Sequence, residues 1–309
     1  MEKLVIIDGN AIVHRAYHAL PPMNTKSGKP TNAVYGFFSM LLKLLADLKP
    51  EYLIVCFDRP KPTFRKQMYV GYQAKRPKMS DDLVPQIDLL HKALDKAKIA
   101  HFEIDGYEAD DLIGTISRQS GEKKLQTIIV TGDRDLLQLV NHRVWVLAPV
   151  LGITKMVLYD EEKVKEKYGL RPSQFIDYKA LVGDASDNYP GVSGIGPKTA
   201  SELLKKYDNF ENLYKHISEL PENVGSRLAV DAEQAALAKK LATIVTDAPV
   251  KMELEKAKTE EIDKKGLLSE FQELGFKSLI GRISNLDNGQ SVNRSQEEKK
   301  NNDKQLELL

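Results

Sequence analysis

The sequence predicts an α/β domain with a mainly parallel sheet flanked by helices, followed by a smaller, all-helical domain. In the first half of the chain, short apolar runs alternate with longer helical patterns, as in successive strand–helix–strand units. From about residue 170 these runs stop, and short helical patterns separated by Gly and Pro replace them. The length of 309 residues is also typical of about two domains.

Runs without polar alternation favour central strands that helices cover on both faces. Five such runs predict the strands of the first domain: KLVIID (3–8), YLIVCFD (52–58), IAHFEID (99–105), QTIIVTGD (126–133) and RVWVLA (143–148). Helical patterns fill residues 31–48, residues 80–97 and the segment after Glu108. We expect domains at 1–169 and 170–284, and a polar tail at 285–309 that is disordered or a linker.

The composition excludes several classes of protein. The net charge is only +1, so any basic surface that binds a polyanion must be local. The single cysteine excludes a disulfide framework and favours a reducing compartment. The chain shows no signal peptide and no apolar run long enough to cross a bilayer. We expect a cytoplasmic protein without a membrane partner, and a monomer.

Acidic residues follow several of the predicted strands. Asp8 ends the first run, Asp58 ends the second, and Asp133 and Asp135 follow the fourth. Each of these residues alone would also suit a turn or a helix N-cap. Because the carboxyl ends of parallel strands meet at one edge of a sheet, we expect these side chains to lie close together.

Two further acidic groups extend this set. GYEADDLIG contains Glu108, Asp110 and Asp111 after the third run, and LVGDASDNYPG contains Asp184 and Asp187 one helical turn apart. Taken alone, the first group also suits a helix start, where acids complement the dipole, and the second suits a polar loop. Carboxylates gathered from all these segments would repel one another strongly unless cations lay among them.

Hard divalent cations resolve this conflict. Mg²⁺ takes oxygen ligands, and it uses a few carboxylates together with several waters. The size of the acidic set therefore predicts two Mg²⁺ or Mn²⁺ ions, an arrangement that supports in-line displacement at a phosphate. The sequence has no Cys/His cluster for zinc, no GxxxxGK[ST] phosphate loop and no DxDxDG calcium loop.

Two segments predict contact with nucleic acid. RPKPTFRKQMYVGYQAKRPKM (59–79) contains no acid, has aromatic residues among its Lys and Arg residues, and directly follows Asp58. Such a segment suits a polyanion held against metal ions, although a solvated basic loop is the alternative. In GVSGIGPKTASELLKKY (191–207), a tight turn precedes a helix whose first amides can hold a phosphate.

Five collinear motifs resemble the flap endonuclease-like 5′-nuclease family, which includes the N-terminal 5′→3′ exonuclease domain of bacterial DNA polymerase I. They are LVIIDGNAIVHRAYHAL, FDRPKPTFRKQMYVGYQAKRP, GYEADDLIGT, VTGDRDLLQLV and LVGDASDNYPGVSGIGPKTASELL, and the resemblance covers about residues 1–285. It implies a helical arch at about 59–98 and a helix-hairpin-helix module at about 187–207. It also implies hydrolysis of DNA phosphodiesters at a 5′ end, nick or 5′ flap, in replication and repair.

The resemblance also implies roles for particular residues. All nine acids match metal positions of the family: Asp8, Asp58, Glu108, Asp110 and Asp111 lie mainly towards a first ion, and Asp133, Asp135, Asp184 and Asp187 towards a second. A K⁺ ion can bind the hairpin through backbone carbonyls. The implied DNA contacts are Arg15, Phe64, Arg65, Tyr72, Gln73, Arg76, Gly191, Gly194, Gly196 and Lys198, and Arg65, Lys75 and Arg76 are the implied catalytic cations.

One residue departs from the family pattern. The family usually carries Lys directly after the arch tyrosine, where this chain has Gln73. Our hypothesis is that Lys75 or Arg76 partly supplies the lost charge, with Arg76 stabilising the charge that develops at the scissile phosphate.

Two other functions compete with a 5′-nuclease. A binding module for branched DNA that does not cut would be expected to lack some of the acids, and an RNA nuclease of the PIN class would be expected to be shorter and to lack the hairpin domain. The chain contains no polymerase sequence, so we expect no polymerase activity in it. The polar tail suits a linker to polymerase domains, as partners in cis or in trans, and a complete chain is the alternative.

Overall fold

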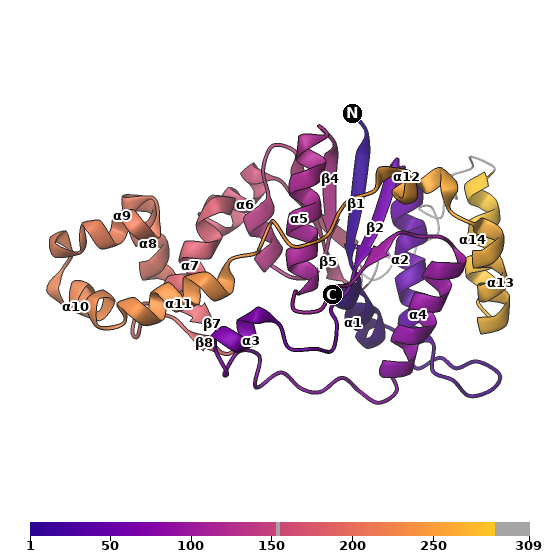
Figure 1. Cartoon of the computed structure of the whole chain (residues 1–309), viewed down its shortest axis with the longest axis horizontal. Coiled ribbons are helices and arrows are strands. Elements are labelled where there is room, and N and C mark those ends of the chain that lie inside the picture. Colours follow the sequence, from indigo (N-terminus) through magenta and orange to yellow (C-terminus); the bar gives the residue numbers. More distant parts are fainter. Residues whose placement is uncertain (153–154, 288–309) are drawn as a thin grey trace, which may run out of the picture.

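The computed structural model describes residues 1–152 and 155–287. Its centre is a six-stranded sheet with the strand order β3-β2-β1-β4-β5-β6 (Figure 1). The strands are β1 (Lys3–Asp8), β2 (Tyr52–Cys56), β3 (His101–Phe102), β4 (Gln126–Val130), β5 (Val144–Leu151) and β6 (Lys155–Tyr159). Every neighbouring pair is parallel except β5 and β6. The predicted α/β fold with a mainly parallel sheet is therefore confirmed.

Helices cover both faces of this sheet. Because successive side chains of a strand point to opposite faces, Leu4 and Ile6 of β1 belong to one core and Val5 and Ile7 to the other. The first core includes α5 (Ala109–Glu122), and the second includes α1 (Gly9–Ala19), α2 (Asn32–Leu48) and α4 (Val84–Lys96). Burial on both faces explains why the middle residues of β1, β2 and β4 are apolar without polar alternation.

Two strands differ from the sequence-based expectation. The expected strand 99–105 pairs with β2 only at His101 and Phe102, because it is an edge strand and the chain turns at Gly106, where φ is +87°. Strand β6 was not expected. It pairs antiparallel with β5 and forms the opposite edge of the sheet, where only one neighbouring strand is needed.

The basic segment leaves the sheet edge and crosses to the helical part of the molecule (Figure 1). It contains the short helix α3 (Phe64–Met68), followed by turns that lead into α4. Asn188 Nδ2 donates to Gly71 O at 2.7 Å, and Gln73 N donates to Asp187 O at 2.8 Å. These bonds fix the segment across the space between the sheet and the helical part.

The second half of the chain forms a helical extension on one side of the sheet (Figure 1). After α6 (Glu161–Tyr168) come α7 (Phe175–Val182), α8 (Pro197–Tyr207), α9 (Phe210–Lys215), α10 (Glu222–Val230) and α11 (Ala232–Ala242). The small hairpin of β7 (Gly183–Asp184) and β8 (Tyr189–Pro190) links α7 to α8. This part confirms the predicted smaller helical domain.

The chain then returns to the sheet. After α12 (Leu254–Ala257), helix α13 (Lys264–Leu274) packs on α4 and α14 (Lys277–Asp287) packs on α2 (Figure 1). The sequence pattern placed these helices in the second domain. Apolar side chains such as Phe271, which meets Phe38 at 5.1 Å between ring centres, are instead buried in the second core of the sheet. We propose that the helical domain ends before α12.

The expected tail begins within α14, which continues through Asp287, and residues 288–309 lie outside the described residues. None of the helices described in residues 1–152 and 155–287 combines the length and the apolar character that crossing a bilayer would require.

Candidate active site

A cleft of about 630 Å³ opens at the carboxyl ends of the parallel strands, where the sheet meets the helical extension. It gathers carboxylates that are distant in the sequence. Of the nine predicted acids, those that line it are Asp8, Asp58, Glu108, Asp110, Asp133, Asp135 and Asp187. Basic side chains, among them Arg59, Lys66 and Arg76, form part of the same wall.

Local hydrogen bonds orient the first of these carboxylates. Asp8 is the last residue of β1 and caps α1: one oxygen accepts from Ala11 N at 3.0 Å, and the other accepts from Thr131 Oγ1 at 2.7 Å. Asp58 Oδ1 accepts from Ala109 N at 2.7 Å, which ties the end of β2 to the start of α5. The carboxylates are therefore held in place before any ligand arrives.

A second group of carboxylates comes from the helical side. Asp135 in the 3-10 helix η1 (Asp135–Leu139), Asp184 in β7 and Asp187 offer oxygens that all lie within 4.8 Å of one another. The ammonium of Lys179, on α7, forms ion pairs with both Asp135 and Asp184. Sequence reasoning missed Lys179, because a lysine five residues before Asp184 looks like any solvated helix residue.

Burial and mutual repulsion change the acidity of the site. Burial raises the pKa values of Asp8, Glu108 and Asp135, each to about 7. Burial and the neighbouring charge of Asp133 raise the pKa of Asp110 well above its usual value. Burial alone would also raise the pKa of Asp184, but the hydrogen bond from Lys179 lowers it.

This set of donors fits divalent cations. It consists of carboxylate oxygens drawn from several elements, which hard cations such as Mg²⁺ prefer, and it leaves negative charge without a matching number of cationic side chains. The raised pKa values report the cost of holding these carboxylates together in their charged form.

We expect divalent cations to stabilise the folded chain. In chelator, carboxyls whose pKa is raised to about 7 in the folded state reduce stability as pH rises from about 4 to about 7, because the unfolded chain releases those protons more easily. Millimolar Mg²⁺ at pH 8 should raise the melting temperature, since a ligand at 100 times its Kd contributes about 2.7 kcal/mol. An identical melting curve with and without Mg²⁺ would contradict this expectation.

Lys179→Met tests the lysine that links the second group. Without this ammonium, Asp135 and Asp184 lose their counter-charge, so the metal-free protein should melt at a lower temperature. The rise in melting temperature on adding Mg²⁺ should then exceed that of the wild type. Lys163→Met, which removes an exposed pair with Glu166 at 2.7 Å, is the control and should change neither value much.

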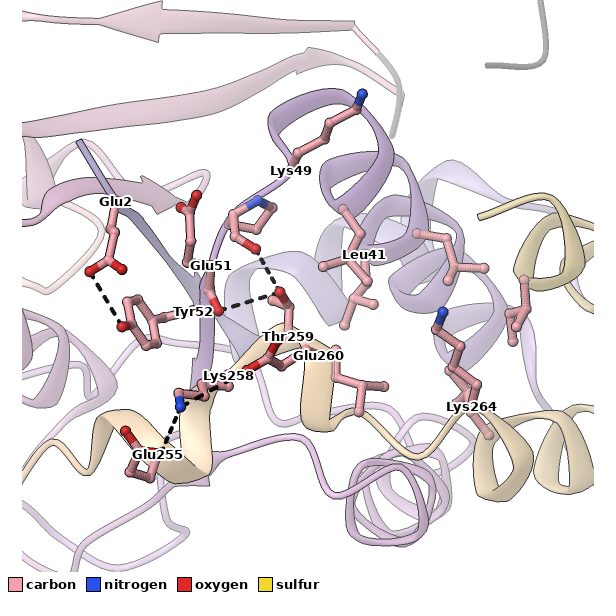
Figure 2. A pocket seen from close by; sticks show the side chains of 16 residues that line it. Glu2, Leu41, Lys49, Glu51, Tyr52, Glu255, Lys258, Thr259, Glu260 and Lys264 are labelled. Carbon is pink, nitrogen blue, oxygen red and sulfur yellow. Dashed lines mark hydrogen bonds and ion pairs between the residues drawn. The ribbon is translucent and has the colours of Figure 1, made fainter. Parts of the chain in front are cut away.

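A second cavity, of about 700 Å³, lies at the opposite end of the sheet (Figure 2). Leu41 and other aliphatic side chains line it, and several of its polar groups already have partners. Lys258 pairs with Glu255 at 2.7 Å, and Thr259 Oγ1 donates to Pro50 O at 2.7 Å (Figure 2). These contacts anchor the segment that returns from the helical extension, so this cavity is not the candidate active site.

Comparison with known proteins identifies the family of this chain. Residues 3–169 match the family model of the 5′-3′ exonuclease N-terminal, resolvase-like domain, and residues 170–265 match that of the 5′-3′ exonuclease C-terminal SAM fold. The chain belongs to the 5′-3′ exonuclease family. The predicted resemblance to 5′-nucleases, and the prediction of an enzyme, are thereby confirmed.

Individual relatives of the exonuclease family agree. The 5′-3′ exonuclease of Aquifex aeolicus is 38% identical over 93% of this chain and 96% of its own length. DNA polymerase I of Caldicellulosiruptor bescii is 44% identical over 91% of this chain but only 33% of the relative. The chain thus spans about a third of the length of the DNA polymerase I relatives that it matches.

Solved structures show the same fold. A T5 5′-exonuclease with bound zinc ions is 22% identical, covers 94% of this chain and 100% of its own, and has a TM-score of 0.65. The catalytic core of Rad2 in complex with DNA has a TM-score of 0.57 at 16% identity, covering 92% of this chain and 91% of its own.

Two of the residues to which the family resemblance gave a role form a buried ion pair. Asp111 is fully buried, and its carboxylate accepts hydrogen bonds from the guanidinium of Arg65 at 2.7 and 2.8 Å. Arg65 is 2% exposed and also donates to the carbonyls of Leu241 and Thr243, each at 2.9 Å. Asp111 is not among the described residues that line the cleft, whereas Arg65 lies in its wall with the guanidinium turned to Asp111. We therefore propose a structural role for this pair.

Other expected DNA contacts are also engaged within the protein. The Tyr72 hydroxyl donates to Glu108 at 3.1 Å and to Asp187 at 3.3 Å, and its ring is buried beside Tyr189, so it cannot stack on a base in this conformation. Phe64 packs near Tyr107, at 6.0 Å between ring centres. Arg15 Nε donates to Gly152 O at 3.0 Å.

The residues around Gln73, where the chain departs from the family pattern, fall into two groups. Gln73 and Arg76 line the cleft, and Arg76 Nη2 lies 3.3 Å from Asp187 Oδ1. Lys75 is exposed and is not among the described residues that line the cleft. The geometry therefore favours Arg76 over Lys75 as the cation that compensates for Gln73.

The hairpin residues lie together at the start of α8. Gly191 approaches the backbone so closely that a Cβ there would lie 2.3 Å from Leu181 O, so a larger residue would displace the chain. Gly194 has a φ of +74°, which favours glycine. Gly196 precedes α8 without a side-chain cap bond, and Lys198 is exposed beside it.

Proposed function

We propose that the chain is a metal-dependent, structure-selective 5′→3′ exonuclease and 5′-flap endonuclease that hydrolyses DNA phosphodiesters. The observation that carries this proposal is the convergence of carboxylates from both parts of the chain on one cleft, next to a basic wall. Relatives named 5′-3′ exonuclease and DNA polymerase I support the same activity and a role in replication and repair.

We propose that two Mg²⁺ or Mn²⁺ ions bind between these carboxylates. Asp8, Asp58, Glu108 and Asp110 would hold the first, and Asp133, Asp135, Asp184 and Asp187 the second. When bound, such ions supply an activated water and stabilise the leaving oxygen of the phosphodiester. The hydrogen bonds to Asp8 and Asp58 keep those carboxylates oriented, so little reorganisation is needed during the reaction.

The proposed DNA contacts follow from exposure and position. Arg76 is exposed at the cleft, where its guanidinium can leave Asp187 for a phosphate of the 5′ strand. Lys66 lies on the same wall, and the hairpin with Lys198 would hold the duplex backbone without reading sequence. Because the polymerase relatives are about three times longer, we propose polymerase domains as partners in cis or in trans.

Cleavage-site mapping tests the proposal. DNA labelled at the 5′ end and carrying a 5′ flap, a nick or a gap should be cut in Mg²⁺ at or near the junction, and should stay intact in chelator. A matched 3′-flap duplex is the control. Equal cleavage of 5′ and 3′ flaps, or full activity in chelator, would contradict it, and preferential cleavage of RNA would favour a PIN-class nuclease.

Substitutions of Gln73 and of the two cations after it should change turnover by unequal amounts. Gln73→Lys should raise turnover only modestly, because Arg76 already places a cation at the cleft. Arg76→Ala should reduce turnover by about 10–100-fold, corresponding to about 1.4–2.7 kcal/mol, whereas Lys75→Ala should have a small effect. Single-turnover cleavage of a 5′ flap measures all three. A loss in Lys75→Ala as large as that in Arg76→Ala would contradict the placement.

A further inference from the structure

The hairpin loop between β8 and α8 is held by side chains from the far end of the helical extension. Arg227 Nη1, from α10, donates to Gly194 O at 2.9 Å, and Gln234 Nε2, from α11, donates to Gly191 O. Asp231, between these helices, accepts from Ser193 N at 2.7 Å. Two loop carbonyls therefore already have donors within the protein.

Arg227 packs directly against the loop. Its Nη1 lies 2.6 Å from the position that a Cβ on Gly194 would occupy, so the glycine makes room for the guanidinium. Arg227 is nevertheless exposed, and its guanidinium carries five N–H donors, of which the Gly194 carbonyl uses one. The remaining donors can bind another acceptor at the surface of the hairpin.

This arrangement does not fit a K⁺ ion coordinated by the carbonyls of Gly191 and Gly194. The guanidinium is charged at any accessible pH, and it already occupies the oxygen of Gly194. A K⁺ ion on the same carbonyl would lie within a few ångströms of a fixed positive charge and would be repelled. The second occupied carbonyl, at Gly191, removes a further ligand.

We propose that Arg227 is the built-in cation of this hairpin, so that its grip on a duplex backbone requires no monovalent metal ion. The guanidinium binds Gly194 O on one side and a phosphate oxygen on the other, beside the uncapped start of α8. This inference rests on the proposed function only in that the hairpin binds DNA.

The decisive experiment compares cations on the wild-type chain. Its Kd for a 5′-flap duplex is measured by fluorescence anisotropy, once in KCl and once in choline chloride of equal concentration. Chelator is present in both measurements. We expect the two values to agree within about twofold, because no monovalent ion is required. Binding that is fivefold or more tighter in KCl would overturn the inference, and an absence of DNA binding in either salt would overturn the proposed function with it.

Arg227→Gln provides the second comparison. It removes the charge and frees Gly194 O, so binding in choline chloride should weaken by about 5–20-fold, and KCl should restore part of the loss. A DNA-free readout accompanies it: K⁺ in place of choline should raise the melting temperature of this variant but not that of the wild type. Equal affinity of variant and wild type in choline would overturn the inference.

Two further variants separate charge from packing. Arg227→Lys keeps the charge and should retain most of the affinity in choline. Lys215→Gln removes an exposed charge from α9 without touching the hairpin and should leave the cation comparison unchanged. If Arg227→Gln does not fold, the comparison of KCl with choline chloride on the wild type still shows whether DNA binding requires K⁺, because it needs no variant.

Discussion

Asp133→Asn is expected to abolish cleavage while leaving the fold intact. Asp133 lines the cleft, and its Oδ1 accepts from Asp135 N at 2.8 Å, a bond that an asparagine carbonyl can keep. The exchange removes one negative charge from the proposed second metal group. Loss of about 4 kcal/mol of transition-state stabilisation corresponds to a cleavage rate about a thousandfold lower.

The same exchange should raise the stability of the metal-free protein. The charge of Asp133 contributes to the raised pKa values of Asp110 and Asp135, so neutralising it relieves repulsion. Single-turnover cleavage of a 5′ flap and thermal melting in chelator measure the two effects. Asp88→Asn, an exposed exchange on α4, is the matched control. Cleavage within tenfold of the wild type would contradict the metal assignment.

Arg65→Met is expected to destabilise the protein strongly. Removing the guanidinium leaves the buried carboxylate of Asp111 without its partner and two carbonyls without a donor. Removing one partner of a buried ion pair lowers the free energy of unfolding by about 3–5 kcal/mol. The melting temperature should therefore fall by roughly 6–15 °C.

Controls separate this structural role from a DNA contact. Arg118→Met, which removes an exposed pair with Glu122 at 2.5 Å, should cost about 1 kcal/mol or less. Adding Asp111→Asn to Arg65→Met should recover part of the stability, because the unpaired charge is gone. At a temperature where the Arg65→Met variant is folded, its Kd for flap DNA should be close to that of the wild type. Weaker binding with an unchanged melting temperature would restore the DNA-contact hypothesis.

The acidic site was largely visible in the sequence. Asp8, Asp58 and Asp133 follow buried strands, and strand direction alone brings such residues to one edge of a parallel sheet. The side chains that organise them were not visible. Thr131 bonds to Asp8, and Lys179 pairs with Asp135 and Asp184, but neither residue stands out from an ordinary strand or helix position.

The arch motif shows where sequence pattern and chemistry diverge. A basic segment with interleaved aromatics predicts nucleic-acid contacts for all its cations and rings equally. In the folded chain, Arg65 turns inward to Asp111 and Tyr72 turns inward to Glu108, while Arg76 stays exposed at the cleft. Residue type sets what a side chain can bind, and only its position decides which partner is within reach.

The sequence by itself determined the fold class, the strand-end carboxylates and the helical domain with its hairpin, because apolar periodicity and turn residues act over a few neighbouring positions. The tertiary structure alone decided the long-range pairings. Arg227 meets Gly194 across 33 positions, Arg65 meets Asp111 across 46, and α13 returns to pack on α4. Such contacts depend on burial and charge neutralisation after the chain has folded, and no local pattern encodes them.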